Sequence, residues 1–132
     1  MKLKLLCPIL LLSVSHLAAK TSEKGWSAQS GNDILPKCVA AVDFMDQKDL
    51  PRDRAEDGLE CLNYVAGYLD GFGSAQTTIK GMPVLCFPER SNTGEVVRVF
   101  VKWMRDHPEK LNEPTSVCLS SATTQAVACK FP

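Results

Sequence analysis

Apolar residues recur every three or four positions in four stretches of the chain, a spacing that predicts amphipathic helices with one buried face. These stretches cover about residues 34–47, 57–78, 93–106 and 113–129. Residues 48–57 are charged and interrupted by Pro51, so they are expected to form a loop that leads into the second helix. The pattern predicts an all-α fold, a small four-helix single domain.

Candidate N-cap residues predict where two of these helices begin. Asn92 followed by Glu95 predicts a capping box for the third helix, and Thr93 alone is the other candidate cap. Asn112 is the expected cap of the last helix, with Pro114 in its first turn. Each cap satisfies backbone N–H groups that have no partner inside the helix.

Two spacings within the helices carry predictions about packing. Gly67 and Gly71 lie four positions apart, which favours the close approach of another helix at that face. Cys118 and Cys129 are eleven positions apart, and at about 100° per residue they fall within about 20° of one line along the last helix. Cys118 is therefore expected to face the core.

The beginning of the chain has the pattern of a secretory signal peptide. Two lysines precede an apolar run over residues 5–14, which is too short for a permanent membrane span. We expect residues 1–19 to be the signal peptide, 20–33 a flexible leader and 34–132 the helical domain. The protein is then exported, with no stable membrane span after cleavage. Retention of the segment as an uncleaved anchor is the alternative.

Composition narrows the function classes. The chain has 132 residues, 45% of them hydrophobic, with 15 basic and 15 acidic residues, which suits one globular domain. Without residues 1–19 it keeps 13 basic and 15 acidic residues, and a net charge of −2 gives no argument for nucleic acid as a partner. The exported part has one histidine and no CxxC pair, so neither a metal site nor a cofactor is predicted.

The cysteines predict a fold that is stapled by disulfides. After residue 19 the chain contains Cys38, Cys61, Cys86, Cys118 and Cys129. In the oxidising compartment beyond the inner membrane, two disulfides and one free thiol follow. Five cysteines forming two bridges allow fifteen arrangements, five choices of the free cysteine with three pairings each. The shared helical face makes Cys118 a rival of Cys129 for Cys86.

A set of motifs in a fixed order resembles the Rap/Tai-type immunity proteins, over about residues 34–130. The motifs are Cys61-x-x-Tyr64-x-x-Gly67-Tyr68-x-x-Gly71, Cys86-Phe87-Pro88, a capped helix, His107-Pro108-Glu109 and a late Cys129. The resemblance implies a periplasmic helical antidote without enzymatic activity. The implied partner is a peptidoglycan amidase toxin delivered by a type VI secretion system, and the implied mechanism is plugging of the active-site cleft of that toxin.

The same resemblance implies the disulfides Cys38–Cys61 and Cys86–Cys129, with Cys118 at a position where the family more typically has an aliphatic residue. It also directs attention to two segments that could enter a cleft, the loop 89–95 and the turn 48–57. The partner-binding candidates are Glu89, Arg90, Ser91, Asn92, Thr93, Glu95, Arg52 and Asp53. We expect alanine at 89, 90 and 92 together to weaken toxin binding with helicity unchanged.

The segment 43–60 contains seven acidic residues against three basic ones, which indicates either a solvated face or a patch for a basic partner.

Other functions also stay open. The chain could be an orphan periplasmic binding or stress protein, chaperone-like in acid. A small exported hydrolase would need Cys118 and His107, the one Cys–His pair outside the expected bridges, but helical phase and a His-Pro helix stop favour structural roles for both. A homodimer is compatible with the spare cysteine and the apolar faces.

Overall fold

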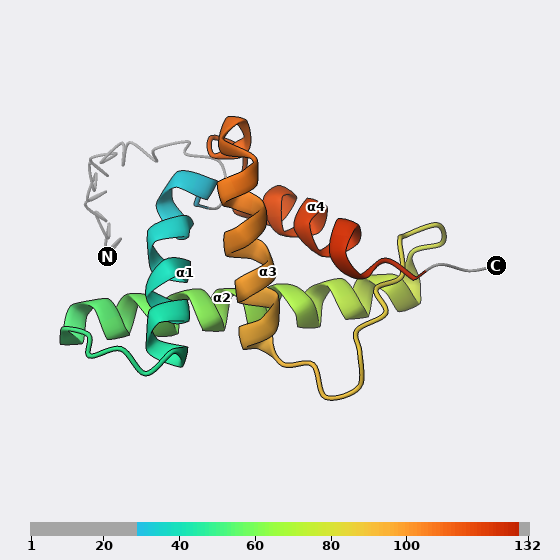
Figure 1. The fold of residues 1–132 in the computed structure, drawn as a ribbon. Helices are drawn as coiled ribbons and strands as arrows, with labels where there is room; N and C mark the ends of the chain where they lie inside the picture. Colours follow the sequence, from blue (N-terminus) through green and yellow to red (C-terminus); the bar gives the residue numbers. More distant parts are fainter. Residues whose placement is uncertain (1–28, 130–132) are drawn as a thin grey trace, which may run out of the picture.

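The computed structural model describes residues 29–129, which form four α helices and one short 3-10 helix (Figure 1). The α helices are α1 (Gly31–Met45), α2 (Arg52–Thr78), α3 (Thr93–Asp106) and α4 (Thr115–Val127), and the 3-10 helix η1 covers Pro108–Lys110. Within the described residues, β structure is limited to two isolated bridges. The predicted all-α four-helix domain is confirmed. The predicted signal peptide and the leader up to residue 28 lie outside the described residues.

The first helix begins three residues earlier than the apolar pattern predicts. Asp33 explains the difference, because its carboxylate accepts hydrogen bonds from the Ser30 backbone N–H at 2.9 Å and from the Ser30 hydroxyl at 2.7 Å. This link closes a capping box around the first turn. Residues 31–33 are thus helical rather than part of the leader expected over 20–33.

The second helix also begins earlier than predicted, at Arg52 instead of about Asp57. Pro51 occupies the N-cap position, where its fixed φ suits a helix start and its missing N–H leaves no donor unpaired. Ion pairs then span the first turns, Arg52 with Glu56 and Arg54 with Asp57. The loop predicted over 48–57 is therefore helical from residue 52 onward.

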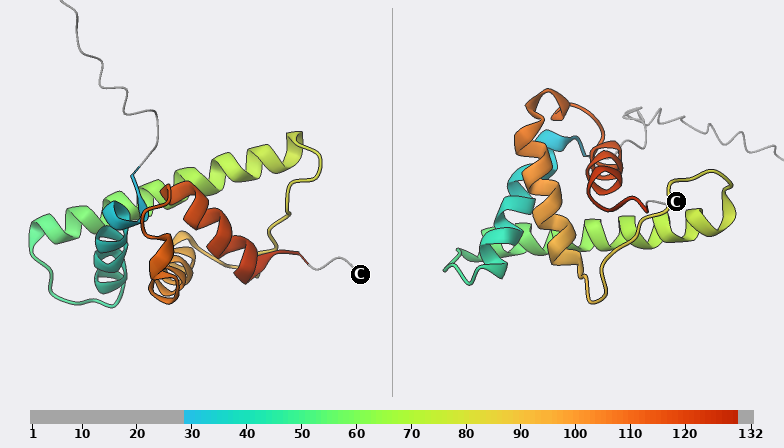
Figure 2. Two further views of the ribbon diagram at one scale, coloured as in Figure 1. Left: turned by 90° about the horizontal axis from the view of Figure 1, so that it is seen from above. Right: turned by 45° about the vertical axis from the view of Figure 1, so that its right-hand side comes forward.

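The helices pack in two layers, with α1 and α3 side by side across one face of the long α2 and with α4 beside α3 (Figures 1 and 2). Their inner faces supply one core. Its largest fully buried side chains are Phe100, Ile34, Met104 and Leu119. At roughly 1.5 to 3 kcal/mol per large apolar side chain, this burial is the main source of stability.

The crossing of α1 over α2 depends on a small residue that the sequence pattern does not single out. A Cβ built on Gly58 would lie 3.0 Å from the Ala41 backbone nitrogen, which is tighter than most Cβ contacts in proteins. Gly67 and Gly71, by contrast, are exposed and would have no atom within 4 Å of such a Cβ. The prediction that these two glycines admit another helix is wrong, because none of the described helices covers that face of α2.

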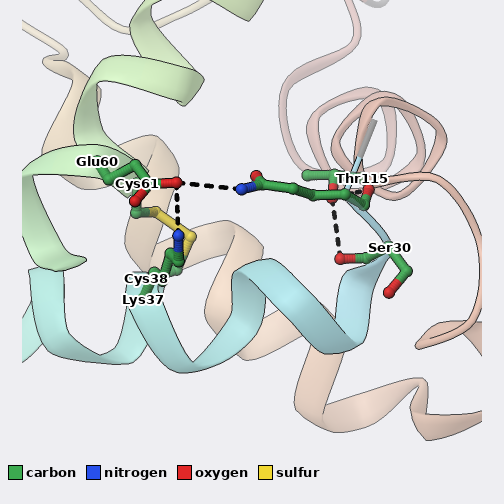
Figure 3. Close-up of a disulfide and its surroundings, with 7 residues drawn as sticks. Ser30, Lys37, Cys38, Glu60, Cys61 and Thr115 are labelled. Carbon is green, nitrogen blue, oxygen red and sulfur yellow. Dashed lines mark hydrogen bonds and ion pairs between the residues drawn. A yellow bond between two sulfur atoms is a disulfide. The ribbon is translucent and has the colours of Figure 1, made fainter. Parts of the chain in front are cut away.

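A buried disulfide between Cys38 and Cys61 holds the same crossing together, with both residues fully excluded from solvent. Beside it on the surface, the Glu60 carboxylate pairs with the Lys37 ammonium and accepts a hydrogen bond from the Gln29 side chain at 3.1 Å (Figure 3). These hydrogen bonds lower the pKa of Glu60. The covalent bond and the polar contacts thus fix α1 against α2 at one place.

The last helix begins without the predicted cap. Pro114 occupies its N-cap position, and the Asn112 side chain instead accepts a hydrogen bond from Asn32 at 2.7 Å. The Thr115 hydroxyl donates to the Gln29 carbonyl at 2.6 Å, which ties the start of α4 to the start of α1. Asn112 therefore links the two ends of the fold rather than capping α4.

Helix α1 ends in a Schellman motif whose left-handed residue is Gln47, with φ of 58°. The N–H groups of Gln47 and Lys48 donate to the carbonyls of Phe44 and Asp43 at 3.1 Å each.

Glycine adopts the left-handed conformation of Gln47 without steric conflict. We expect Gln47→Gly to raise the free energy of unfolding by about 0.5–1 kcal/mol in urea denaturation, and Gln47→Ala to give no such gain.

None of the helices in the described part of the chain is long and apolar enough to cross a membrane.

Candidate functional site

The most distinctive surface feature is the segment that joins α2 to α3, residues 79–92, here called the strap. It leaves the far end of α2, turns at Gly81 with φ of +85°, and runs back to the start of α3 (Figure 1). The Gln76 side-chain amide donates to the Pro83 carbonyl at 2.8 Å and ties the strap to α2. The strap contains no regular secondary structure, so its position depends on such individual anchors.

The middle of the strap is joined to the end of α4. Cys86 N–H donates to the Val127 carbonyl at 2.7 Å, and Cys129 N–H donates to the Val84 carbonyl at 2.8 Å. A disulfide joins Cys86 and Cys129 at the same place. Both disulfides of the structure thus have the pairing that the family resemblance implies.

The tip of the strap is a turn formed by residues 88–91, in which Ser91 N–H donates to the Pro88 carbonyl at 3.0 Å. Its third residue, Arg90, has φ of 72°, a left-handed conformation that is unfavourable for a residue other than glycine. Glu89 and Arg90 are exposed, and neither has an ion pair or side-chain hydrogen bond within residues 29–129. The tip therefore presents two opposite charges to an incoming partner.

Two of the predicted binding residues also have structural roles. The Asn92 side chain accepts a hydrogen bond from Glu95 N–H at 3.1 Å, and the Glu95 carboxylate accepts one from Asn92 N–H at 3.3 Å. Asn92 is thus the cap of α3, as one of the two alternatives predicts. Alanine at position 92 would remove this cap, so the triple replacement at 89, 90 and 92 also affects the stability of α3.

We expect Asn92→Ala to lower the free energy of unfolding by about 1 kcal/mol, because it leaves a backbone donor of α3 without its partner. Asn92→Asp keeps an acceptor oxygen at the same place and should stay within a few tenths of a kcal/mol of the parent. Urea denaturation followed by circular dichroism measures both variants. Equal stability of the alanine and aspartate variants would contradict the conclusion that the Asn92 side chain stabilises α3 as its cap.

Arg52 and Asp53 do not join the strap in one surface. They lie in the first turn of α2, whereas the strap faces residues 69–76 of the same helix. At 1.5 Å per residue, Arg52 is about 27 Å from Asp70 along the helix axis. Arg52 is also engaged with Glu56 at 2.9 Å. The eight candidates therefore form two separate groups. Six lie in the strap and at the start of α3, and the other two, Arg52 and Asp53, lie at the beginning of α2.

The acidic segment 43–60 is largely neutralised. Five of its seven acidic residues have ion pairs, which are Asp43–Lys48, Asp46–Arg98, Arg52–Glu56, Arg54–Asp57 and Lys37–Glu60. The hydrogen bond from Arg98 lowers the pKa of Asp46. These pairs favour a solvated face over an acidic patch for a basic partner.

Cys118 and His107 make different side-chain contacts. Cys118 is a free, fully buried cysteine whose thiol donates to the Lys110 carbonyl at 3.4 Å. Burial raises the pKa of that thiol, and Glu113 adds to the increase, which disfavours a nucleophilic thiolate. The His107 ring stacks on Trp103, and its Nδ1 lies 2.8 Å from the Trp103 carbonyl oxygen. The prediction that Cys118 faces the core is confirmed.

Two cavities flank the strap. The larger, about 550 Å³, lies between the strap and the last turns of α2, and the smaller, about 160 Å³, lies between the strap, α3 and α4. Phe87, Pro88 and Ser91 line both of them. The strap is thus a ridge with a hollow on each side, and it crosses the surface without filling the space beneath it.

The described domain is helical, is joined by two disulfides, and has an anchored loop that exposes charged side chains. The model of the Rap1a immunity proteins matches residues 30–132, and the chain therefore belongs to this family. The resemblance noted in the sequence is confirmed. Membership indicates an effector protein as the partner. No curated protein and no solved structure matches the chain.

Proposed function

We propose that this protein is a periplasmic immunity protein that inhibits a peptidoglycan amidase delivered by type VI secretion, by occluding its active-site cleft. The observation that carries the proposal is the strap tip. There Glu89 and Arg90 stand exposed on a turn that is fixed by a disulfide on one side and a helix cap on the other.

Inhibition of this kind needs no catalytic group, because binding alone denies the substrate access to the nucleophile of the toxin. Affinity then depends on how little freedom the inserted loop loses. The Cys86–Cys129 disulfide and the Asn92 cap restrict the strap before it meets a partner, which lowers the entropy lost on binding. Glu89 and Arg90 can then pair with charged groups that line the cleft.

The periplasm is the proposed location. Two disulfides suit an oxidising compartment, and the basic, apolar start of the sequence suits export. A peptidoglycan amidase acts in that same compartment, so antidote and toxin would meet there.

The test is capture of the partner by the full chain, exported into the periplasm of its source bacterium with a C-terminal tag and purified under oxidising conditions. Mass spectrometry should identify one dominant amidase, bound in a fixed ratio and inactive in the complex. A diffuse set of client proteins, or none, would contradict the proposal and favour the orphan stress role. Suppression of protein aggregation at low pH would then test that role.

A further inference from the structure

The larger cavity beside the strap has the size and chemistry of a side-chain receptor. Its volume of about 550 Å³ falls within the range of ligand sites and exceeds one large aromatic side chain. Its apolar walls come from Leu69 and Phe72 of α2 and from Leu85 and Phe87 of the strap. The presence of a phenylalanine on α2 and another on the strap favours an aromatic occupant.

The rim of this cavity is polar and charged. Asp70 lies on the α2 side and Arg90 on the strap side, and neither has an ion pair within residues 29–129. A carboxylate at the rim can accept a hydrogen bond from an indole N–H or a phenol O–H. The cavity is therefore suited to tryptophan or tyrosine, whose rings are apolar while one edge is polar.

The position of the cavity points to the source of that side chain. Arg90, proposed to contact the effector, also lines the cavity, as do Ser91, Asn92 and Thr93. An effector surface that meets the strap tip consequently faces the mouth of the cavity. Aromatic side chains that fill a pocket at the centre of an interface commonly dominate its binding energy.

We infer that the cavity between α2 and the strap receives an aromatic side chain, tryptophan or tyrosine, from the effector protein. This inference rests on the proposed function for the identity of the partner. Recognition is then reciprocal: the strap tip enters the effector, and an effector side chain enters the hollow behind the tip.

Glycines on α2 provide a matched pair of variants. Gly73 lines the cavity, and Gly67 lies on the same helix away from it. A Cβ at either position would have no atom within 4 Å, so both accept a side chain, and both gain helix propensity equally. Gly73→Trp fills the cavity, whereas Gly67→Trp adds the same side chain elsewhere.

The first experiment uses N-acetyl-tryptophanamide as a probe and needs no effector. In NMR titrations of the oxidised protein, the amide signals of Gly73 and Ser91 should shift saturably at millimolar probe. The shift at Ser91 should be lost in Gly73→Trp and kept in Gly67→Trp, with N-acetyl-leucinamide binding more weakly. Absence of saturable shifts in the parent protein overturns the inference, as does an unchanged shift at Ser91 in Gly73→Trp.

The second experiment measures affinity for the captured effector by calorimetry. Gly73→Trp should bind at least thirtyfold more weakly, and Gly67→Trp should bind like the parent, with both variants melting at or above the parent temperature. Unchanged affinity of Gly73→Trp overturns the inference even where the immunity function holds. Failure to capture any effector contradicts the proposed function instead, and the probe titration still decides whether the cavity is an aromatic receptor.

Discussion

A dithiol reductant is expected to cleave the Cys86–Cys129 disulfide at least a hundredfold faster than Cys38–Cys61 in the folded protein. Thiol–disulfide exchange requires the attacking thiolate to reach a sulfur atom. Cys86 is exposed, whereas Cys38 and Cys61 are both 0% exposed in the core between α1 and α2. The reductant can reach the buried bond only in molecules that have unfolded. With a free energy of unfolding of about 5 kcal/mol or more, fewer than about one molecule in a thousand is unfolded at any time.

Timed alkylation of the released thiols, followed by mass spectrometry of peptides, measures the two rates. The control is the same reduction in concentrated guanidinium, where both bonds are exposed and the rates should converge. Similar rates in the native protein would mean that the crossing of α1 and α2 opens far more often than its burial indicates.

Replacing Glu89 and Arg90 together by alanine is expected to weaken effector binding by about a hundredfold, or about 2.7 kcal/mol. Charged side chains that become buried in an interface with their partners commonly contribute on this scale when they are removed. Neither side chain has an ion pair or side-chain hydrogen bond within the described residues, so the fold should keep its stability. Calorimetry with the purified effector measures the affinity, and thermal melting checks the fold.

Arg52→Ala together with Asp53→Ala is the matched control for the strap variant. It also removes one positive and one negative charge, but at the opposite end of α2. Its affinity should equal that of the parent protein. A larger loss in this control than in the strap variant would place the binding surface at the start of α2.

Much of the fold follows from local patterns in the sequence. Apolar residues that recur every three or four positions predict a helix whatever it packs against. The Asn92–Glu95 spacing predicts a helix cap, because both hydrogen bonds of the capping box lie within one turn. The beginning of α2 is harder to predict. Pro51 looks like the middle of a loop until the structure shows it at the N-cap position, directly before a helical turn.

The parts of the candidate site that the sequence does not predict depend on contacts between distant segments. Gly58 has no periodic signal, because its role requires the backbone of α1 at Ala41. The cavity beside the strap depends on the path of residues 79–92, which a disulfide to Cys129 fixes from the other end of the domain. The sequence names Arg90 as a binding residue, but its left-handed backbone becomes evident only in the turn.

Cys118 precedes Cys129 in the chain, and this order bears on how the protein matures. As an exported chain enters an oxidising compartment from its N-terminal end, Cys118 becomes available to Cys86 before the native partner Cys129, which follows eleven residues later. A Cys86–Cys118 bond would draw a fully buried sulfur out of the core of α4, so native packing selects against it. We therefore expect native pairing to need disulfide isomerisation more often than it would with an aliphatic residue at position 118, which has no thiol to compete for Cys86.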